Sequence, residues 1–181
     1  MKTSIPAVVL MVLLITSCRF DYGETPSPED DQQRPDFTLR ELDYGVVLGD
    51  GSQIKFIARK GDFHEQQHST ELQEVTFHQY SPEGELLTLG WSNEAVIDLH
   101  TEDALLLGSV VIHALDEDLI ITADQLFWHR SDQVLSAPAE ALVTMEQTHG
   151  TMTRGRGFTA DLYRREFRFT DEVRGELNES P

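Results

Sequence analysis

The chain has 181 residues, with 32 acidic against 14 basic side chains and a formal net charge of −18. A field of that sign repels phosphate backbones and argues against nucleic-acid binding, and it also disfavours flat adsorption on an anionic membrane. The length suits one domain preceded by a short leading segment.

Residues 1–17 have the pattern of an export signal. Lys2 supplies a positive charge, and the apolar run from Ile5 to Ile15 is about half of the roughly 20 residues that a membrane-spanning helix needs. Thr16 and Ser17 then precede Cys18, the only cysteine. This ending resembles the lipobox of bacterial lipoproteins, which implies that Cys18 is acylated and becomes the first mature residue. A plain secretory signal with an incidental cysteine is the alternative.

Residues 18–36 predict a flexible tether that is acidic and contains proline. The segment holds Pro26, Pro28 and Pro35 together with the acidic run Glu29-Asp30-Asp31, and it has almost nothing to bury. Such a composition cannot offset the entropy lost on ordering. We therefore expect an extracytoplasmic domain that is lipid-anchored to a membrane through Cys18.

From residue 37 the sequence changes to short segments with apolar residues at every second position, which predicts an antiparallel all-β domain over residues 37–172 and a polar tail over 173–181. Gly49-Asp50-Gly51-Ser52 and Ser81-Pro82-Glu83-Gly84 have the composition of hairpin turns. The expected strands are 44–48, 53–60, 69–80, 86–91, 95–100, 104–115, 119–130, 134–147 with an interruption, and 158–169.

A short sequence motif that occurs twice suggests repeated hairpins. Ile121-Thr122-Ala123-Asp124 is followed by an aromatic segment, and Phe158-Thr159-Ala160-Asp161 shows the same order. Repetition of one supersecondary unit builds extended stacks with open ends. Chance similarity within a β-rich composition is the alternative.

These residues resemble a known family, the LptC-type periplasmic component of the lipopolysaccharide export machinery, over about residues 37–172. The residues that carry the resemblance are Gly108, Val110, Ile112, Thr122-Ala123-Asp124, Leu126, Trp128, Leu135, Val143, Gly150, Gly155-Arg156-Gly157-Phe158 and Ala160-Asp161. The resemblance implies an OstA/LptA-like β-jellyroll, an open twisted groove. It also implies a function: the protein would receive lipopolysaccharide, or a related glycolipid, from an inner-membrane ABC transporter and pass it to the next LptA-like jellyroll. A lipobox in place of the uncleaved membrane helix of many members is a departure from the family pattern.

A groove for such a cargo needs a continuous apolar lining, because each CH₂ kept from water is worth about 0.8 kcal/mol. Ordinary core packing is the alternative for any single residue. The candidate lining residues are Phe56, Phe77, Leu89, Ile97, Val110, Ile112, Ile121, Phe127, Val143, Phe158, Phe167 and Phe169.

The sequence gives little support to an enzyme, and it predicts no metal site and no cofactor. The seven histidines are scattered, and neither a nucleophile motif nor a phosphate-binding loop is present. Two alternatives to lipid transport remain: a structural or adhesive β-sandwich lipoprotein, and a carbohydrate-binding module that stacks sugars on Trp91 or Trp128.

Overall fold

The computed structural model describes residues 34–147, 150–161, 164 and 166–177. The predicted signal, Cys18 and most of the predicted tether therefore lie outside the described residues. The chain divides into two units, residues 1–34 and 35–181, and the description below concerns the second unit. Within the described residues we find no helix whose length and apolar character would allow it to cross a membrane.

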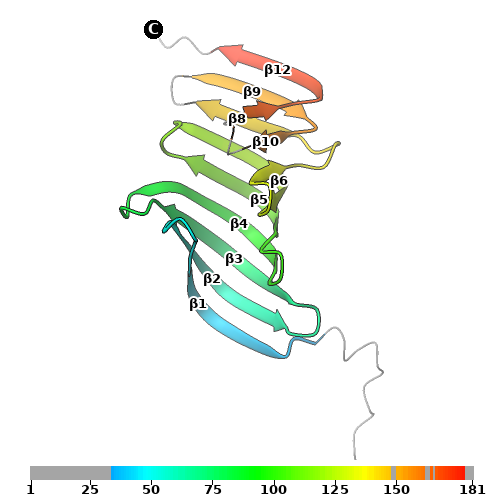
Figure 1. Ribbon diagram of the computed structural model, residues 1–181. Helices are drawn as coiled ribbons and strands as arrows, with labels where there is room; N and C mark the ends of the chain where they lie inside the picture. The colour runs from blue at the N-terminus through cyan, green and yellow to red at the C-terminus, as the bar shows by residue number, and fades with distance from the viewer. Residues whose placement is uncertain (1–33, 148–149, 162–163, 165, 178–181) are drawn as a thin grey trace, which may run out of the picture. The chain divides into compact units, whose positions relative to one another are not determined.

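The described residues form twelve antiparallel strands and no helix, so the all-β prediction is confirmed (Figure 1). The first six strands form a meander in which each strand pairs with its neighbour in the chain. The strands are β1 (Phe37–Val47), β2 (Gln53–His64), β3 (Ser69–Tyr80), β4 (Leu86–Asp98), β5 (Ala104–Ala114), β6 (Leu119–His129), β7 (Val134–Ser136), β8 (Val143–Gln147), β9 (Thr151–Arg156), β10 (Thr159–Asp161), β11 (Glu166–Arg168) and β12 (Asp171–Leu177).

Each long strand changes phase near its middle. In β3 the buried residues Leu72 and Val75 are three positions apart, and in β6 Ala123 and Leu126 have the same spacing. Glu74 between the first two has φ 53°, in the left-handed region. A residue in this conformation shifts the alternation by one position, as a β-bulge does. We call the line of these positions across β1–β6 the bend line.

The bend line divides the sheet into two leaves. Residues 127–129 of β6 pair with β7, whereas residues 119–123 pair with β8. The first leaf therefore continues through β7, β10 and β11, and the second leaf continues through β8, β9 and β12. Because the phase changes at the bend line, buried side chains of both leaves belong to one common inner face, which is how a single sheet encloses a core.

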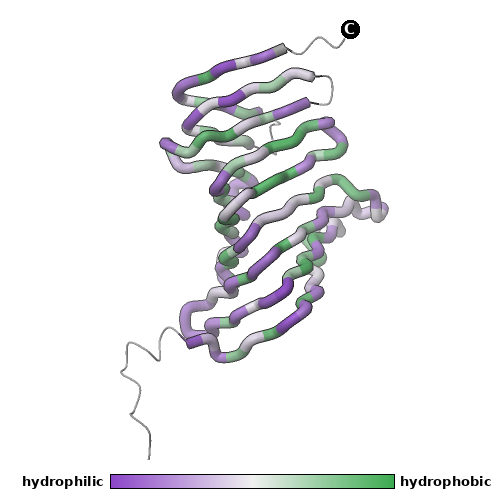
Figure 2. The backbone as a smooth tube through the Cα atoms, turned by 180° about the vertical axis from the view of Figure 1, so that it is seen from behind, coloured by the Kyte–Doolittle hydropathy of each residue, from purple (hydrophilic) through white to green (hydrophobic). Residues whose placement is uncertain are grey.

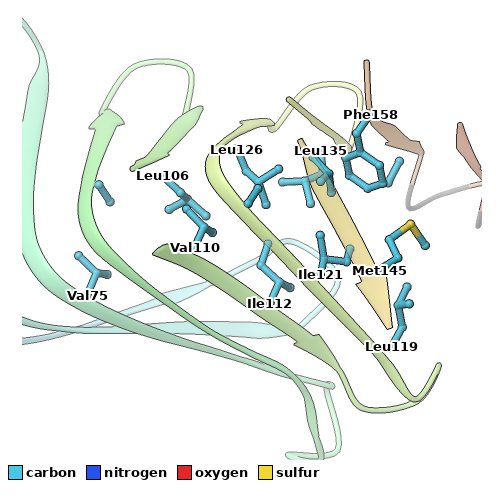
Figure 3. Packing of buried hydrophobic residues seen from close by; sticks show 14 of the residues in the cluster. Val75, Leu106, Val110, Ile112, Leu119, Ile121, Leu126, Leu135, Met145 and Phe158 are labelled. Carbon is cyan, nitrogen blue, oxygen red and sulfur yellow. The ribbon is translucent and has the colours of Figure 1, made fainter. Parts of the chain in front are cut away.

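The core is made of aliphatic side chains from the inner faces of both leaves. Figure 3 shows Leu106, Val110, Leu126, Met145 and Phe158 within one packed layer. Hydrophobic residues are concentrated in the middle strands, whereas polar residues alternate with apolar ones along β1 to β3 (Figure 2). Among the described residues, most of the buried hydrophobic side chains lie from Leu106 onward, so the C-terminal half of the sheet supplies most of the core.

Three expectations that involve the C-terminal region were wrong. The predicted strand 158–169 is two short strands, β10 and β11, and β12 extends the sheet beyond the predicted domain end at residue 172. The two similar motifs do not form a structural repeat. Thr122-Ala123 lies on the second leaf, where it pairs with β8, whereas Thr159-Ala160 lies on the first leaf, where it pairs with β7. β12 was not predicted because four of its seven residues are charged and residues 171–176 are exposed, so it shows no alternating apolar pattern.

Candidate functional site

The inner face of the first leaf carries one unbroken row of side chains, with one residue from each strand. Directly paired positions of an antiparallel sheet share a face, so the strand register defines the row. Eight of its nine members are apolar; the exception is Thr70. From the first strand to the last, the row is Phe37, Phe63, Thr70, Ile97, Ala104, Trp128, Leu135, Ala160 and Phe167.

The inner face of the second leaf has a matching row. Its middle is aliphatic and buried at Ile112, Ile121 and Met145, while Phe56 and Phe77 are half-buried beside them. In strand order the row is Tyr44, Phe56, Phe77, Gly90, Ile112, Ile121, Met145, Thr153 and Gly175.

Between these two rows, next to the bend line, the side chains are almost completely buried. Val75, Val110 and Val143 on the second leaf have no exposed surface, and neither does Leu126 on the first leaf. The deepest part of the inner face is therefore ordinary core, as the alternative reading allowed. The two rows, with half-buried Phe56, Phe77, Ile97 and Trp128, are the parts nearer to solvent.

Eight of the twelve candidate residues lie on this common inner face and are buried or half-buried. They are Phe56, Phe77, Ile97, Val110, Ile112, Ile121, Val143 and Phe158. Phe169 packs against the core, and its ring contacts that of Phe158 at a tilt, with ring centroids 5.3 Å apart. Phe167 ends the first-leaf row and is exposed.

Leu89 and Phe127 were wrongly assigned to the inner face. Leu89 pairs with His78 and His113 on the outer face, and Gly90 takes the inner position beside it. Phe127 lies between Leu126 and Trp128, which both face inward. The reason is the phase change at the bend line, which a uniform two-residue period cannot follow. On the outer face, Phe127 contacts His129 with ring centroids 4.6 Å apart.

Several inner residues were missed by sequence reasoning, among them Leu72, Leu106, Leu126 and Met145. Leu72 is out of phase with Val75 and Phe77, so a uniform two-residue period does not place it on their face of β3. The three-residue spacing of Leu72 and Val75 is the signal that would have found it, since it marks a bulge between two buried positions.

The sequence matches the family described as "Lipopolysaccharide-assembly, LptC-related" over residues 5–178. The chain belongs to the LptC-related family. It is accordingly a periplasmic component of lipopolysaccharide transport. No curated protein matches the sequence.

Among solved structures, the LptC-related chain is similar to LptH, the LptA homologous periplasmic component of the lipopolysaccharide transport device from Pseudomonas aeruginosa. The TM-score is 0.52 at 12% sequence identity, covering 70% of this chain and 95% of that chain. At this identity the likeness concerns the fold, and it confirms the predicted antiparallel jellyroll.

Both ends of the inner face are exposed in the LptC-related chain. On β1, Phe37 is 43% exposed, and its ring stacks on Phe63 with centroids 4.4 Å apart. At the other end, Phe167 on β11 is 51% exposed. Apolar side chains at both edge strands mean that the inner surface runs to the open ends of the sheet.

Ionisable groups with shifted pKa values lie away from the inner rows. A hydrogen bond from the Ser52 hydroxyl lowers the pKa of Asp50, and backbone N–H groups of Thr101 and His100 lower the pKa of Asp98. Both carboxylates stabilise turns. Burial would raise the pKa of Asp62, but hydrogen bonds from Lys60 and Thr38 outweigh it and leave the pKa lowered. Among the described residues, no cluster of three or more His, Cys, Asp or Glu is arranged to hold a metal ion.

The arginines near the C-terminus mostly offset neighbouring acids. Arg156 contacts Glu172, and Arg168 contacts Glu166. Arg154 and Arg174 are directly opposite each other on β9 and β12. Arg156 and Arg168 are therefore balanced by neighbouring acids, whereas Arg154 and Arg174 place two like charges on adjacent strands.

Proposed function

We propose that this protein is a lipid-transport bridge component that receives lipopolysaccharide, or a related glycolipid, from an inner-membrane ABC transporter and passes it to the next LptA-like jellyroll. One observation carries the proposal: the first-leaf row continues from Phe37 on the first strand to Phe167 at the end of the same leaf, with exposed apolar side chains at both ends. Such a row offers cover to acyl chains over the whole length of the sheet.

The energetics of the task favour an apolar path over a specific pocket. Each CH₂ group of an acyl chain that stays exposed to water costs about 0.8 kcal/mol of free energy. Neighbouring strands lie about 4.8 Å apart, so successive members of a row are close enough for a chain to stay in contact while it moves. The half-buried side chains Ile97 and Trp128 give the middle of this path an accessible apolar surface.

The open edges supply the connection to neighbouring proteins. β1 pairs only with β2 among the described residues, and β11 pairs only with β10. An unpaired edge strand exposes backbone donors and acceptors that another strand can use. We assign the β1 edge to the transporter side and the β11 and β12 edges to the next jellyroll.

The anchor is part of the same proposal. Acylated Cys18 would hold the domain near the inner membrane, and the acidic residues of 18–36 would keep the chain extended from the surface. Loss of fatty-acid labelling in a Cys18→Ala variant would support this anchor, and unchanged labelling would rule it out.

A carbohydrate-binding role has one observation in its favour. Trp91 is 37% exposed on the outer face, directly opposite exposed Val111, whereas Trp128 faces inward. A sugar stacked on Trp91 would therefore contact the outer face and not the inner rows. Carbohydrate binding and lipid transport thus predict ligand contact on opposite faces of the sheet.

Two adjacent residues of β6 make the test. A photo-crosslinking phenylalanine derivative replaces Trp128 on the inner face or Phe127 on the outer face, and the purified protein is irradiated with lipopolysaccharide. The Trp128 variant is expected to capture lipopolysaccharide and the Phe127 variant is not. Equal capture at both positions would contradict the proposed groove. A third variant carries the crosslinker at Trp91, and capture at that position alone would favour the carbohydrate-binding role.

A further inference from the structure

Gly90 interrupts the second-leaf row at the point where Phe77 precedes it and Ile112 follows it. A Cβ atom added to Gly90 would lie 2.0 Å from Cζ of Phe77 and within 2.6 Å of both Cε atoms. The ring of Phe77 therefore occupies the space that a side chain at position 90 would fill. The Phe77 ring thus lies across β4, along the second-leaf row.

The position of the Phe77 ring affects the width of the space between the inner faces of the two leaves. Phe77 is half-buried and packs against the core, with its ring centroid 6.5 Å from that of Phe56. Glycine weakens a strand interior and commonly marks a place where another group approaches closely. Here the approaching group is an aromatic side chain that would otherwise project from the second leaf toward the space above the row.

We propose that Gly90 is a positioning residue for transport, because it lets Phe77 lie flat and so keeps the path between the leaves wide enough for an acyl chain. This inference rests on the proposed function. The atoms of Phe77 that meet position 90 are at the far end of its side chain, so an added methyl group displaces the ring by rotation and leaves the backbone in place. The displaced ring then narrows the path.

A purely structural role for the same pair makes a different prediction. Aromatic rings that cover glycine in a sheet protect the strand and fix its register. In that case Gly90→Ala and Phe77→Ala change thermal stability, and lipid capture follows the folded fraction. Under the proposal, capture by fully folded protein depends on whether the ring is displaced.

The experiment compares three variants, each with the photo-crosslinker at Trp128: Gly90→Ala, the double variant Phe77→Ala/Gly90→Ala, and the control Gly49→Ala. Gly49 lies in the turn between β1 and β2, outside both rows, and nothing lies within 4 Å of a Cβ built there. Lipopolysaccharide capture is measured over a concentration series, with a thermal melt and a circular dichroism spectrum of each protein.

We expect Gly90→Ala to need about tenfold more lipopolysaccharide for half-maximal capture, equivalent to about 1.4 kcal/mol. The double variant is expected to return to the parent value even if it melts at a lower temperature, and Gly49→Ala is expected to match the parent. If Gly90→Ala does not fold, Phe77→Leu/Gly90→Ala is compared with Phe77→Leu, and the proposal requires weaker capture by the double variant.

Two outcomes overturn the inference in distinguishable ways. Equal capture by the parent and a folded Gly90→Ala variant refutes the role of Gly90 and leaves the proposed function standing. No capture by the parent protein itself refutes the proposed function, and this inference with it.

Discussion

Two buried serines illustrate how differently the same side chain contributes to this sheet. Ser81 closes the turn after β3, where its Oγ accepts hydrogen bonds from the N–H groups of Glu83 and Glu85, each at 3.2 Å. Ser92 lies on the inner face near the bend line with no exposed surface, and its hydroxyl has no hydrogen-bond partner among the described residues. A buried polar group without a partner costs free energy, whereas a satisfied one does not.

Alanine substitutions at these serines should therefore change stability in opposite directions. Ser92→Ala removes an unsatisfied hydroxyl and should raise the free energy of unfolding by up to about 1 kcal/mol, whereas Ser81→Ala should lower it by about 1–2 kcal/mol. Urea denaturation of both variants measures the two values. A clear loss of stability in Ser92→Ala would mean that its hydroxyl has a partner, such as an ordered water.

At the scale of the element, the bend within each strand is the feature that makes a groove from one sheet. Glu41, Glu74 and Ser109 on alternate strands β1, β3 and β5 have φ of 53°, 53° and 50°. Left-handed backbone costs about 1–2 kcal/mol for a residue that has a Cβ, so the packing of both leaves must hold it in place. Glu74 also forms an ion pair with Arg59 at 2.8 Å, but both side chains are exposed and the pair contributes little.

At two positions of β3, substitution by glycine and by valine should affect the stability of the protein in opposite order. At Glu74, in the left-handed region, Gly should be more stable than Val by at least about 1 kcal/mol, since a β-branched residue is most strained there. At Thr76, two residues later in extended conformation on the outer face, Val should be more stable than Gly by a similar amount. Thermal melts of the four variants test this, and the same ranking at both positions would contradict a bend at Glu74.

How far the sequence predicts these elements depends on where the phase changes. The turns and most strands of 53–130 followed from Gly, Pro and Asp punctuation and from two-residue alternation, and the inner positions Phe77, Ile112 and Ile121 followed from the same alternation. Leu89 and Phe127 did not, because each lies near a bend where the alternation shifts by one. A non-glycine residue in left-handed conformation leaves no sequence signal of its own, so the bend becomes visible only as a three-residue spacing of buried side chains.

The end of the sheet was also hidden from the sequence. Four of the seven residues of β12 are charged, residues 171–176 are exposed, and the backbone pairing with β9 holds the strand in the sheet. An apolar pattern in the sequence marks strands that bury a face, whereas an edge strand of this kind buries little. Residues 173–177 of the expected polar tail therefore belong to a strand that forms part of the C-terminal edge.

At the scale of the whole domain, the two rows and the two open edges form one arrangement. The inner rows run across all strands of each leaf, and the edges at which they end have unpaired backbone among the described residues. A jellyroll that only stored lipid would gain by closing its ends. Exposed Phe37 and Phe167 at the ends fit a surface that continues into neighbouring molecules on both sides.

The order in which lipid reaches the two ends tests this account most directly. Photo-crosslinkers replace Phe37 or Phe167 in protein bound to vesicles that contain the ABC transporter and lipopolysaccharide, and ATP starts the reaction. The outward neighbours Thr38 and Arg168 serve as matched controls on the same strands. The account predicts ATP-dependent capture at Phe37 first and at Phe167 later, with little at either control. Capture confined to one end, or equal capture at Thr38 and Arg168, would contradict passage of lipid along the inner face.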